Sequence, residues 1–107
     1  MQSDFVAAYR QGRQLYLARR DIAALESTIA AREARLEWVK SRIVAASTEQ
    51  LNPELTVPQR VDLLAETQRL AEEKAAIEHE LPELHADLAS RTAQLDAMRQ
   101  SLVSVVY

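Results

Sequence analysis

The sequence predicts an all-α fold, a long antiparallel two-helix coiled-coil hairpin, from three observations. Apolar residues recur at alternating steps of three and four, which places them along one side of a helix, here called the seam. The first run is Leu15, Ala18, Ile22, Leu25, Ile29, Leu36, Val39, Ile43 and Ala46, and the second is Leu70, Ile77, Leu81, Leu84, Leu88, Leu95, Met98, Leu102 and Val105. The 107 residues include only one glycine, three prolines and few aromatic rings, which is unusual for a globular core. Asn52-Pro53 separates the two runs, so the chain is expected to turn there.

The ends of both helices carry recognisable signals. Ser3 or Asp4 can cap the first helix, which is expected over about residues 4–50. Thr56 is the predicted N-cap of the second helix, over about residues 57–104, because Gln59 follows three residues later and completes a capping box. The connection then spans only about residues 51–55, and short connections join antiparallel neighbours.

Pro82 lies inside the second predicted helix. It lacks the amide that would bond to the carbonyl of Glu78, and its ring clashes with that carbonyl. The seam nevertheless keeps its phase across this position, so a kink is expected. Two shorter helices running in the same direction are the alternative, and a chain reversal here would give a three-helix bundle.

Alignment of the two seams predicts a register. The expected layers are Ile43 with Leu63, Leu36 with Leu70, Ile29 with Ile77, Leu25 with Leu81 and Ile22 with Leu84, and the expected ion pairs are Arg42 with Glu66 and Arg35 with Glu73. Arg91 interrupts the second seam. Arg32 and Lys74 interrupt the seams at the same level, so either they lean outward to Glu33, Glu73 or Glu78, or this layer is hydrated. Asp21 falls near Asp87, which is an unfavourable pair in this register.

Charge and composition narrow the functional classes. Residues 1–50 carry eight basic and six acidic side chains, and residues 51–107 carry five and ten, so the halves have net charges of +2 and −5. Opposite charges favour packing of one half on the other and argue against a nucleic-acid partner. The chain has no cysteine, no apolar run long enough to span a bilayer, and no signal peptide is expected.

No catalytic, cofactor-binding or metal site is predicted. His79 and His85 are six residues apart with a proline between them, so they do not share a helix face as a histidine pair four residues apart would. His79 and Glu83 could hold an ion together, but two ligands do not complete a site. Two helices also offer no pocket for a catalytic triad. We therefore expect a non-enzymatic structural or interaction module.

Two surfaces of the first helix are candidate interaction sites. The back stripe, opposite the seam, consists of Ala24, Ser27, Ala31, Ala34, Trp38, Ser41 and Ala45. Its small side chains and single tryptophan predict packing against a second copy, giving a homodimer, or against another helical protein. The aromatic face consists of Phe5, Tyr9, Gly12 and Tyr16, where Gly12 either permits close approach of a backbone or ligand or is simply tolerated.

Four arginines lie among these aromatic residues: Arg10, Arg13, Arg19 and Arg20. They could contact an anion, a lipid headgroup or RNA. The preferred interpretation is a solvated flank balanced by acidic residues of the other helix.

The run from Phe5 to Tyr16, followed by a long charged helix and a leucine-rich return, resembles the C-terminal coiled-coil tail of a bacterial lipoprotein family, domain of unknown function 2799. Only Phe5, Tyr9, Gly12 and Tyr16 carry the resemblance distinctly, although the pattern covers nearly the whole chain. The resemblance implies a cell-envelope or periplasmic location and no established activity. A cytoplasmic coiled-coil chaperone or a stalk of a secretion apparatus is the alternative, and a helical binder of nucleic acid or of a membrane surface is a third class.

Overall fold

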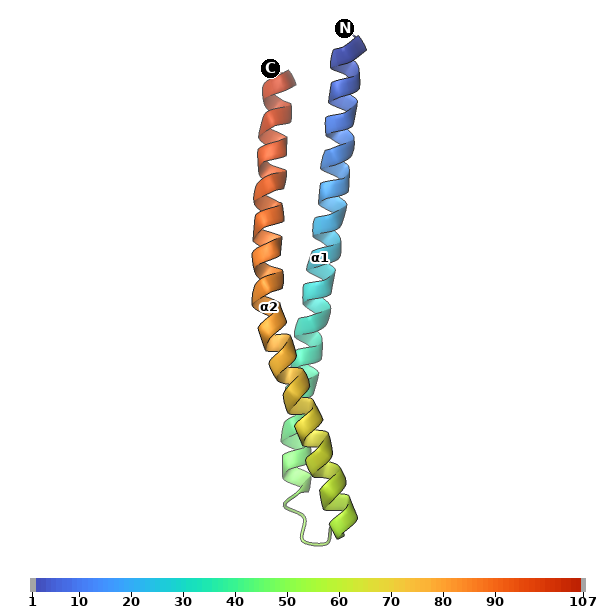
Figure 1. The fold of residues 1–107 in the computed structure, drawn as a ribbon, viewed down its shortest axis with the longest axis vertical. Coiled ribbons are helices and arrows are strands. Elements are labelled where there is room, and N and C mark those ends of the chain that lie inside the picture. The colour runs from blue at the N-terminus through green and yellow to red at the C-terminus, as the bar shows by residue number, and fades with distance from the viewer. Residues whose placement is uncertain (1, 107) are drawn as a thin grey trace. The chain divides into compact units, whose positions relative to one another are not determined.

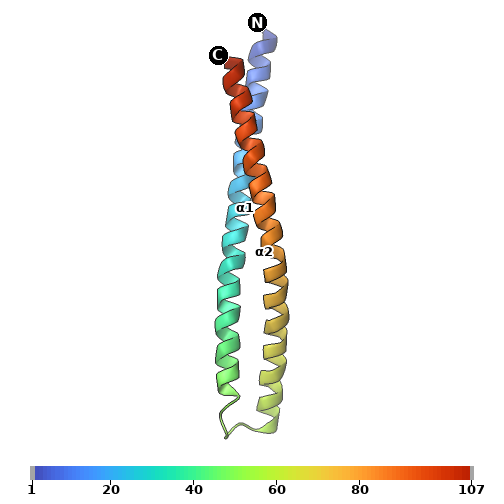
Figure 2. The ribbon, with the colours of Figure 1, turned by 90° about the vertical axis from the view of Figure 1, so that its left-hand side faces the viewer.

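The protein is an all-α hairpin of two long helices packed against each other (Figures 1 and 2). The computed structural model describes the backbone of residues 2–106 and the side chains of residues 5–102. Helix α1 spans Gln2–Glu49 and helix α2 spans Val57–Val106, so the hairpin and the turn between residues 50 and 56 agree with the sequence prediction. The side chains of Ser3 and Asp4, the predicted caps of α1, lie outside the described residues.

The capping box predicted at the start of α2 is confirmed. The amide of Gln59 donates to Thr56 Oγ1 at 3.3 Å, and the amide of Thr56 donates to Gln59 Oε1 at 2.9 Å. These reciprocal bonds satisfy two amides that the first turn of a helix would otherwise leave unpaired.

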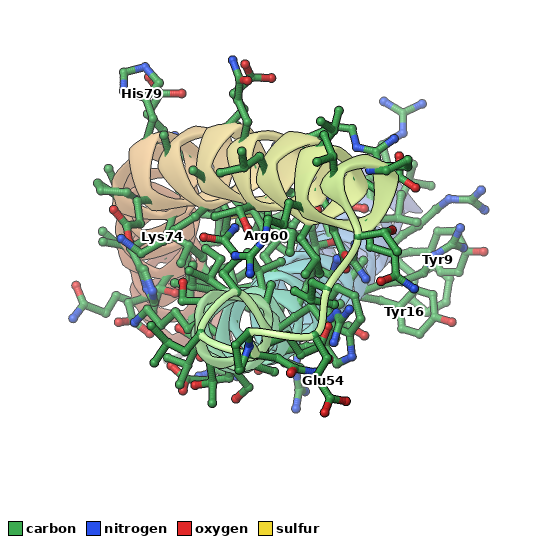
Figure 3. All side chains as sticks on the ribbon, turned by 90° about the horizontal axis from the view of Figure 1, so that it is seen from below. Tyr9, Tyr16, Glu54, Arg60, Lys74 and His79 are labelled. Atoms are coloured by element: carbon green, nitrogen blue, oxygen red, sulfur yellow. The ribbon has the colours of Figure 1, made fainter. Side chains whose placement is uncertain are left out.

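Arg60 ties the turn to both helices. Its Nη1 donates to the carbonyl of Gln50 at 3.0 Å, and its Nη2 donates to the carbonyl of Asn52 at 3.0 Å (Figure 3). Asn52 in turn accepts from the amide of Glu54 at 3.0 Å, which closes a local turn through its side chain. The guanidinium of this α2 residue therefore binds carbonyls of the turn that directly follows α1.

The hairpin divides into two compact units. The turn unit comprises residues 30–82, and the terminal unit comprises residues 1–29 and 83–107. Buried apolar side chains follow the predicted seam in both: Ile22, Ile29 and Leu95 in the terminal unit, and Leu36, Val39, Ala46, Leu63, Leu70 and Ile77 in the turn unit. The remaining predicted seam residues are half-buried, apart from Val105, whose side chain lies outside those described.

The register predicted for the turn unit is supported by its ion pairs. Arg42 contacts Glu66 and Arg35 contacts Glu73, both as expected. Leu36 and Leu70, which were predicted to share a layer, are both buried.

The terminal unit has a different register from the predicted one. Ile22 lines a surface hollow with Leu95 and with the neighbouring Thr92, and its predicted partner Leu84 does not line that hollow. The prediction extended the turn-unit register past Arg32 and Lys74, where no apolar layer exists to fix it. Knobs-into-holes packing transmits register only where consecutive layers interlock.

Helix α2 is continuous through Pro82. The alternative of two shorter helices and the three-helix bundle are therefore wrong, since each requires the helix to end near this residue. Pro82 is exposed, so its ring occupies the solvent side of the helix, and the predicted kink stays a prediction.

Truncation of the seam tests its contribution to stability. Leu36→Ala is expected to lower the free energy of unfolding by about 2–5 kcal/mol, because it leaves a cavity in a buried layer. Urea unfolding followed by circular dichroism measures this change. The control Val6→Ala truncates an exposed side chain and should change stability by less than about 0.5 kcal/mol. Equal effects of the two substitutions would contradict the assigned seam.

Candidate interaction surfaces

One face of the turn unit is built from interhelical arginine–glutamate pairs. Arg42 Nε and Nη2 donate to the two carboxylate oxygens of Glu66 at 2.7 and 3.1 Å. Arg35 Nε and Nη2 donate to those of Glu73 at 2.6 and 3.0 Å. Both pairs are bidentate, the geometry in which a planar guanidinium matches a carboxylate best. We call this side of the turn unit the charged face.

Lys74 and Arg32, the two cations that interrupt the seams of the turn unit, each pair with a carboxylate beside the seam. Lys74 Nζ lies 3.0 Å from Glu78 Oε1, which is one of the partners predicted for it. Arg32 Nε instead lies 3.5 Å from Glu80 Oε1, a partner that the sequence analysis did not name. Both cations therefore lean out of the seam, as expected, and a buried unpaired charge is avoided.

These contacts shift the pKa values of both partners on the charged face so that each stays ionised. The hydrogen bonds from Arg42 and Arg35 are the largest causes that lower the pKa of the Glu66 and Glu73 carboxyls, and desolvation opposes them. The same hydrogen bonds raise the pKa of both guanidinium groups. The ionised pairs are therefore favoured in the folded hairpin.

The opposite face of the turn unit exposes large apolar side chains. Arg35 and Arg42 each directly precede a seam position of α1, and Glu66 and Glu73 each directly precede a seam position of α2. The positions directly before the seam therefore meet on the charged face, and the positions directly after the seam lie toward the opposite face. Val44 follows Ile43 there, and Leu64 follows Leu63. The side chains exposed on this face, on the adjoining outer side of α2 where Val61 lies, and in the turn are here called the turn patch: Val44, Leu51, Val57, Val61 and Leu64, each between 57 and 81% exposed.

The turn patch was missed by the sequence analysis. The signal was present, since Val57, Val61 and Leu64 recur at helical spacing on the side of α2 that faces away from its seam. Both predicted surfaces lie on α1, so this stripe of α2 was not among them.

The back stripe on α1 is largely exposed in the described structure. Ala45 is half-buried, whereas the other six positions are exposed. Trp38 is 50% exposed, and the Arg35 guanidinium lies 4.2 Å from the centroid of its ring. Arg35 is also held by Glu73, so one ion pair and one cation–π contact cover part of the only large side chain in the stripe. Its role as an interface stays a prediction.

The aromatic face of α1 is also uncovered within the described residues. Phe5, Tyr9 and Tyr16 are 63–76% exposed, and Tyr9 and Tyr16 project outward in the same direction (Figure 3). A Cβ added at Gly12 would meet no atom within 4 Å, so no close approach to this glycine occurs within the chain. Gly12 lies beside Tyr16 in a shallow surface hollow.

The four arginines near this face do not have the partners expected from the sequence. Among the described residues, no ion pair joins Arg10, Arg13, Arg19 or Arg20 to a carboxylate of α2. Two acidic residues of α2 in the terminal unit pair within their own helix instead. Asp87 contacts Arg91 at 3.1 Å, and Asp96 contacts Arg99 at 3.9 Å. The expected balance by the other helix is therefore not made by ion pairs in the described part of this unit, and it stays a prediction.

The described residues contain no group of three or more histidine, aspartate or glutamate side chains placed to hold a metal ion. Within the same residues, neither helix holds a segment long and apolar enough to cross a membrane. The features that remain for binding are surfaces: the turn patch, the back stripe and the aromatic face.

Comparisons of the chain with protein-family models, with curated proteins and with solved structures find no match. The resemblance of Phe5, Tyr9, Gly12 and Tyr16 to the lipoprotein family therefore stays a prediction.

The charged face predicts a dependence of stability on pH. A carboxyl pKa that is lower in the folded state adds stability above its ordinary value of 4.5, and this stability is lost as pH falls through the lowered pKa. Urea unfolding between neutral pH and about pH 3 should show this loss, and Glu66→Gln/Glu73→Gln should flatten it. Glu72→Gln is the control, because Glu72 is exposed and makes no ion pair with α1 among the described residues. A double variant with the wild-type pH profile would contradict this account.

Gly12→Ala is expected to stabilise the protein by about 0.5–1 kcal/mol, because alanine favours a helix and the added methyl group meets open space. Thermal unfolding followed by circular dichroism measures the change. The reverse substitution at another exposed position of α1, Ala34→Gly, should destabilise by a similar amount. A destabilised Gly12→Ala variant would indicate that something outside the described chain approaches this glycine closely.

Proposed function

We propose that this protein is a non-enzymatic helical interaction module that associates with a second copy of itself through the turn patch. The single observation that supports this function is the contrast between the two faces of the turn unit. One face joins the helices through paired charges, whereas the opposite face and the outer side of α2 next to it leave Val57, Val61 and Leu64 in solvent.

A second copy fits the turn patch for chemical reasons. The five side chains are aliphatic and uncharged, so a two-fold axis through the patch would bring apolar atoms together without opposing like charges. Burying aliphatic side chains removes apolar area from water, which favours association by about 25 cal/mol per Å² before the costs of association. The back stripe offers less, because most of its side chains are small and Arg35 already covers part of Trp38.

Sedimentation equilibrium tests this assembly. The wild-type chain is expected to sediment as a dimer at micromolar concentration, and Val61→Ser/Leu64→Ser is expected to sediment as a monomer. The control Val6→Ser/Leu17→Ser changes one exposed valine and one exposed leucine outside the patch and should remain dimeric. A patch variant that dimerises as tightly as the wild type would contradict the turn patch as the interface.

Trp38 distinguishes the two candidate interfaces. It lies in the back stripe and outside the turn patch, so its fluorescence should not change as a turn-patch dimer is diluted to monomer. A dilution-dependent shift of its emission would assign the interface to the back stripe instead.

The setting that we propose is the bacterial cell envelope, where the hairpin would form the tail of a lipoprotein. The support is the pattern of Phe5, Tyr9, Gly12 and Tyr16 and the leucine-rich return that follows it. Fractionation of the source cells, with detection of the native protein, tests this setting. Recovery in the membrane or periplasmic fraction supports it, and recovery in the cytoplasm favours a cytoplasmic chaperone or stalk.

A further inference from the structure

The first turns of α1 combine exposed aromatic residues with uncompensated positive charge. Residues 5–20 contain four arginines and no aspartate or glutamate. Phe5, Tyr9 and Tyr16 are at least 63% exposed, and Val6 and Leu17 are partly exposed beside them.

Helical geometry places these residues on one half of the helix surface. At 100° per residue, Phe5, Tyr9 and Tyr16 fall within about 40° of one another. Arg13 and Arg20 follow at about 40–60° from Tyr16. Arg10 and Arg19 border the group on its two sides, and the seam residues Leu15, Ala18 and Ile22 lie outside it. Packing of α1 on α2 therefore leaves this half of the surface in solvent, which we call the aromatic–arginine face.

The arginines of this face have no competing partner in the described structure. Asp87 and Asp96, the acids of α2 that could have reached across, are engaged by Arg91 and Arg99. No other described carboxylate forms an ion pair with Arg10, Arg13, Arg19 or Arg20. Four guanidinium groups are thus available to an external anion.

We infer that the aromatic–arginine face binds the headgroup region of an anionic lipid bilayer. Guanidinium groups pair with lipid phosphates in a bidentate manner, and their alkyl stems can lie along an apolar surface. Tyrosine has an apolar ring and a polar hydroxyl, which suits the boundary between headgroups and acyl chains. Phe5, Val6 and Leu17 supply the apolar contacts that enter this boundary, so the helix lies on the surface without crossing it.

Other occupants fit less well. A second copy of the same face would oppose four positive charges to four others, and like charges at an interface are repelled. An extended nucleic acid would also meet the remaining chain, which carries a net charge of −7 once the four arginines are set aside from the total of −3. A bilayer can engage one face alone.

Co-sedimentation of the full chain with vesicles tests this inference. Vesicles of phosphatidylglycerol and phosphatidylcholine in equal parts should bind the protein, and vesicles of phosphatidylcholine alone should bind it much more weakly. Each arginine near an anionic surface contributes about fivefold to the partition coefficient. Arg10→Gln/Arg13→Gln/Arg20→Gln should therefore lower binding by about a hundredfold. Binding of the wild type should also weaken as salt is raised.

The matched control is Lys40→Gln/Arg69→Gln/Lys74→Gln, which changes the net charge equally but leaves residues 5–20 and the Asp87–Arg91 pair intact. It should bind the anionic vesicles much as the wild type does. Phe5→Ser/Tyr9→Ser retains all charges and should bind several-fold more weakly, with an unchanged dependence on salt. Circular dichroism of each variant verifies that the helices are retained.

Three results would overturn the inference: equal binding to both vesicle types, equal loss of binding in the two triple variants, or binding of a single-stranded RNA with the same arginine dependence and no binding of vesicles. The outcome is separable from dimer formation, because Val61→Ser/Leu64→Ser leaves the aromatic–arginine face unchanged and should bind vesicles whether or not it dimerises.

Discussion

A pair of helices can bury only one stripe on each, and this constraint determines most of what the protein offers to a partner. In the turn unit the stripe on α1 includes Leu36 and Val39, and the stripe on α2 includes Leu63, Leu70 and Ile77. Every residue outside these stripes faces solvent or a neighbouring molecule. Large apolar side chains outside the seam are therefore exposed in this fold. The side of the seam on which each one lies determines the face of the hairpin on which it is exposed.

The arginine–glutamate pairs determine which side of the seam carries the charged face and which side is left apolar. Arg35 and Arg42 are seven residues apart, as are Glu66 and Glu73, so the same contact recurs at the repeat of the seam. The Arg35–Glu73 pair is exposed and the Arg42–Glu66 pair is half-buried, and each stabilises the fold little by itself because water and salt screen its charges. Its greater effect is on geometry. A bidentate pair forms in one alignment of the helices, and this alignment leaves Val57 and Leu64 on the opposite face, with Val61 beside them on the outer side of α2.

Local and periodic features of this structure could be predicted from the sequence. The seam follows from steps of three and four, the capping box from Thr56 and Gln59, and the two bidentate pairs from the alignment of the seams. Each of these features depends on residues close together in the sequence or on the seven-residue repeat of the seam.

The partners of the remaining long charged side chains could not be predicted from the sequence pattern. Arg60 could have reached any of several carboxylates, but it donates to the carbonyls of Gln50 and Asn52, whose positions exist only after the turn has formed. Arg32 selects Glu80 over nearer glutamates in the sequence. Asp87 and Asp96 pair within α2, so the charge balance expected for residues 5–20 is not made by ion pairs in the described residues. Long flexible side chains have several partners of similar energy, and the sequence does not rank them.

The two exposed surfaces differ in the force that would hold a partner, and this difference limits what each can bind. The turn patch is aliphatic, so its association gains from apolar burial and is strengthened by salts that are excluded from protein surfaces. The aromatic–arginine face carries four guanidinium groups, so its association gains from opposite charge and is weakened as salt screens that charge. A single partner that covered both would show neither dependence clearly. Because Val61 and Leu64 lie in one unit and Tyr9 and Tyr16 in the other, the chain itself keeps the apolar and the cationic interaction on separate segments.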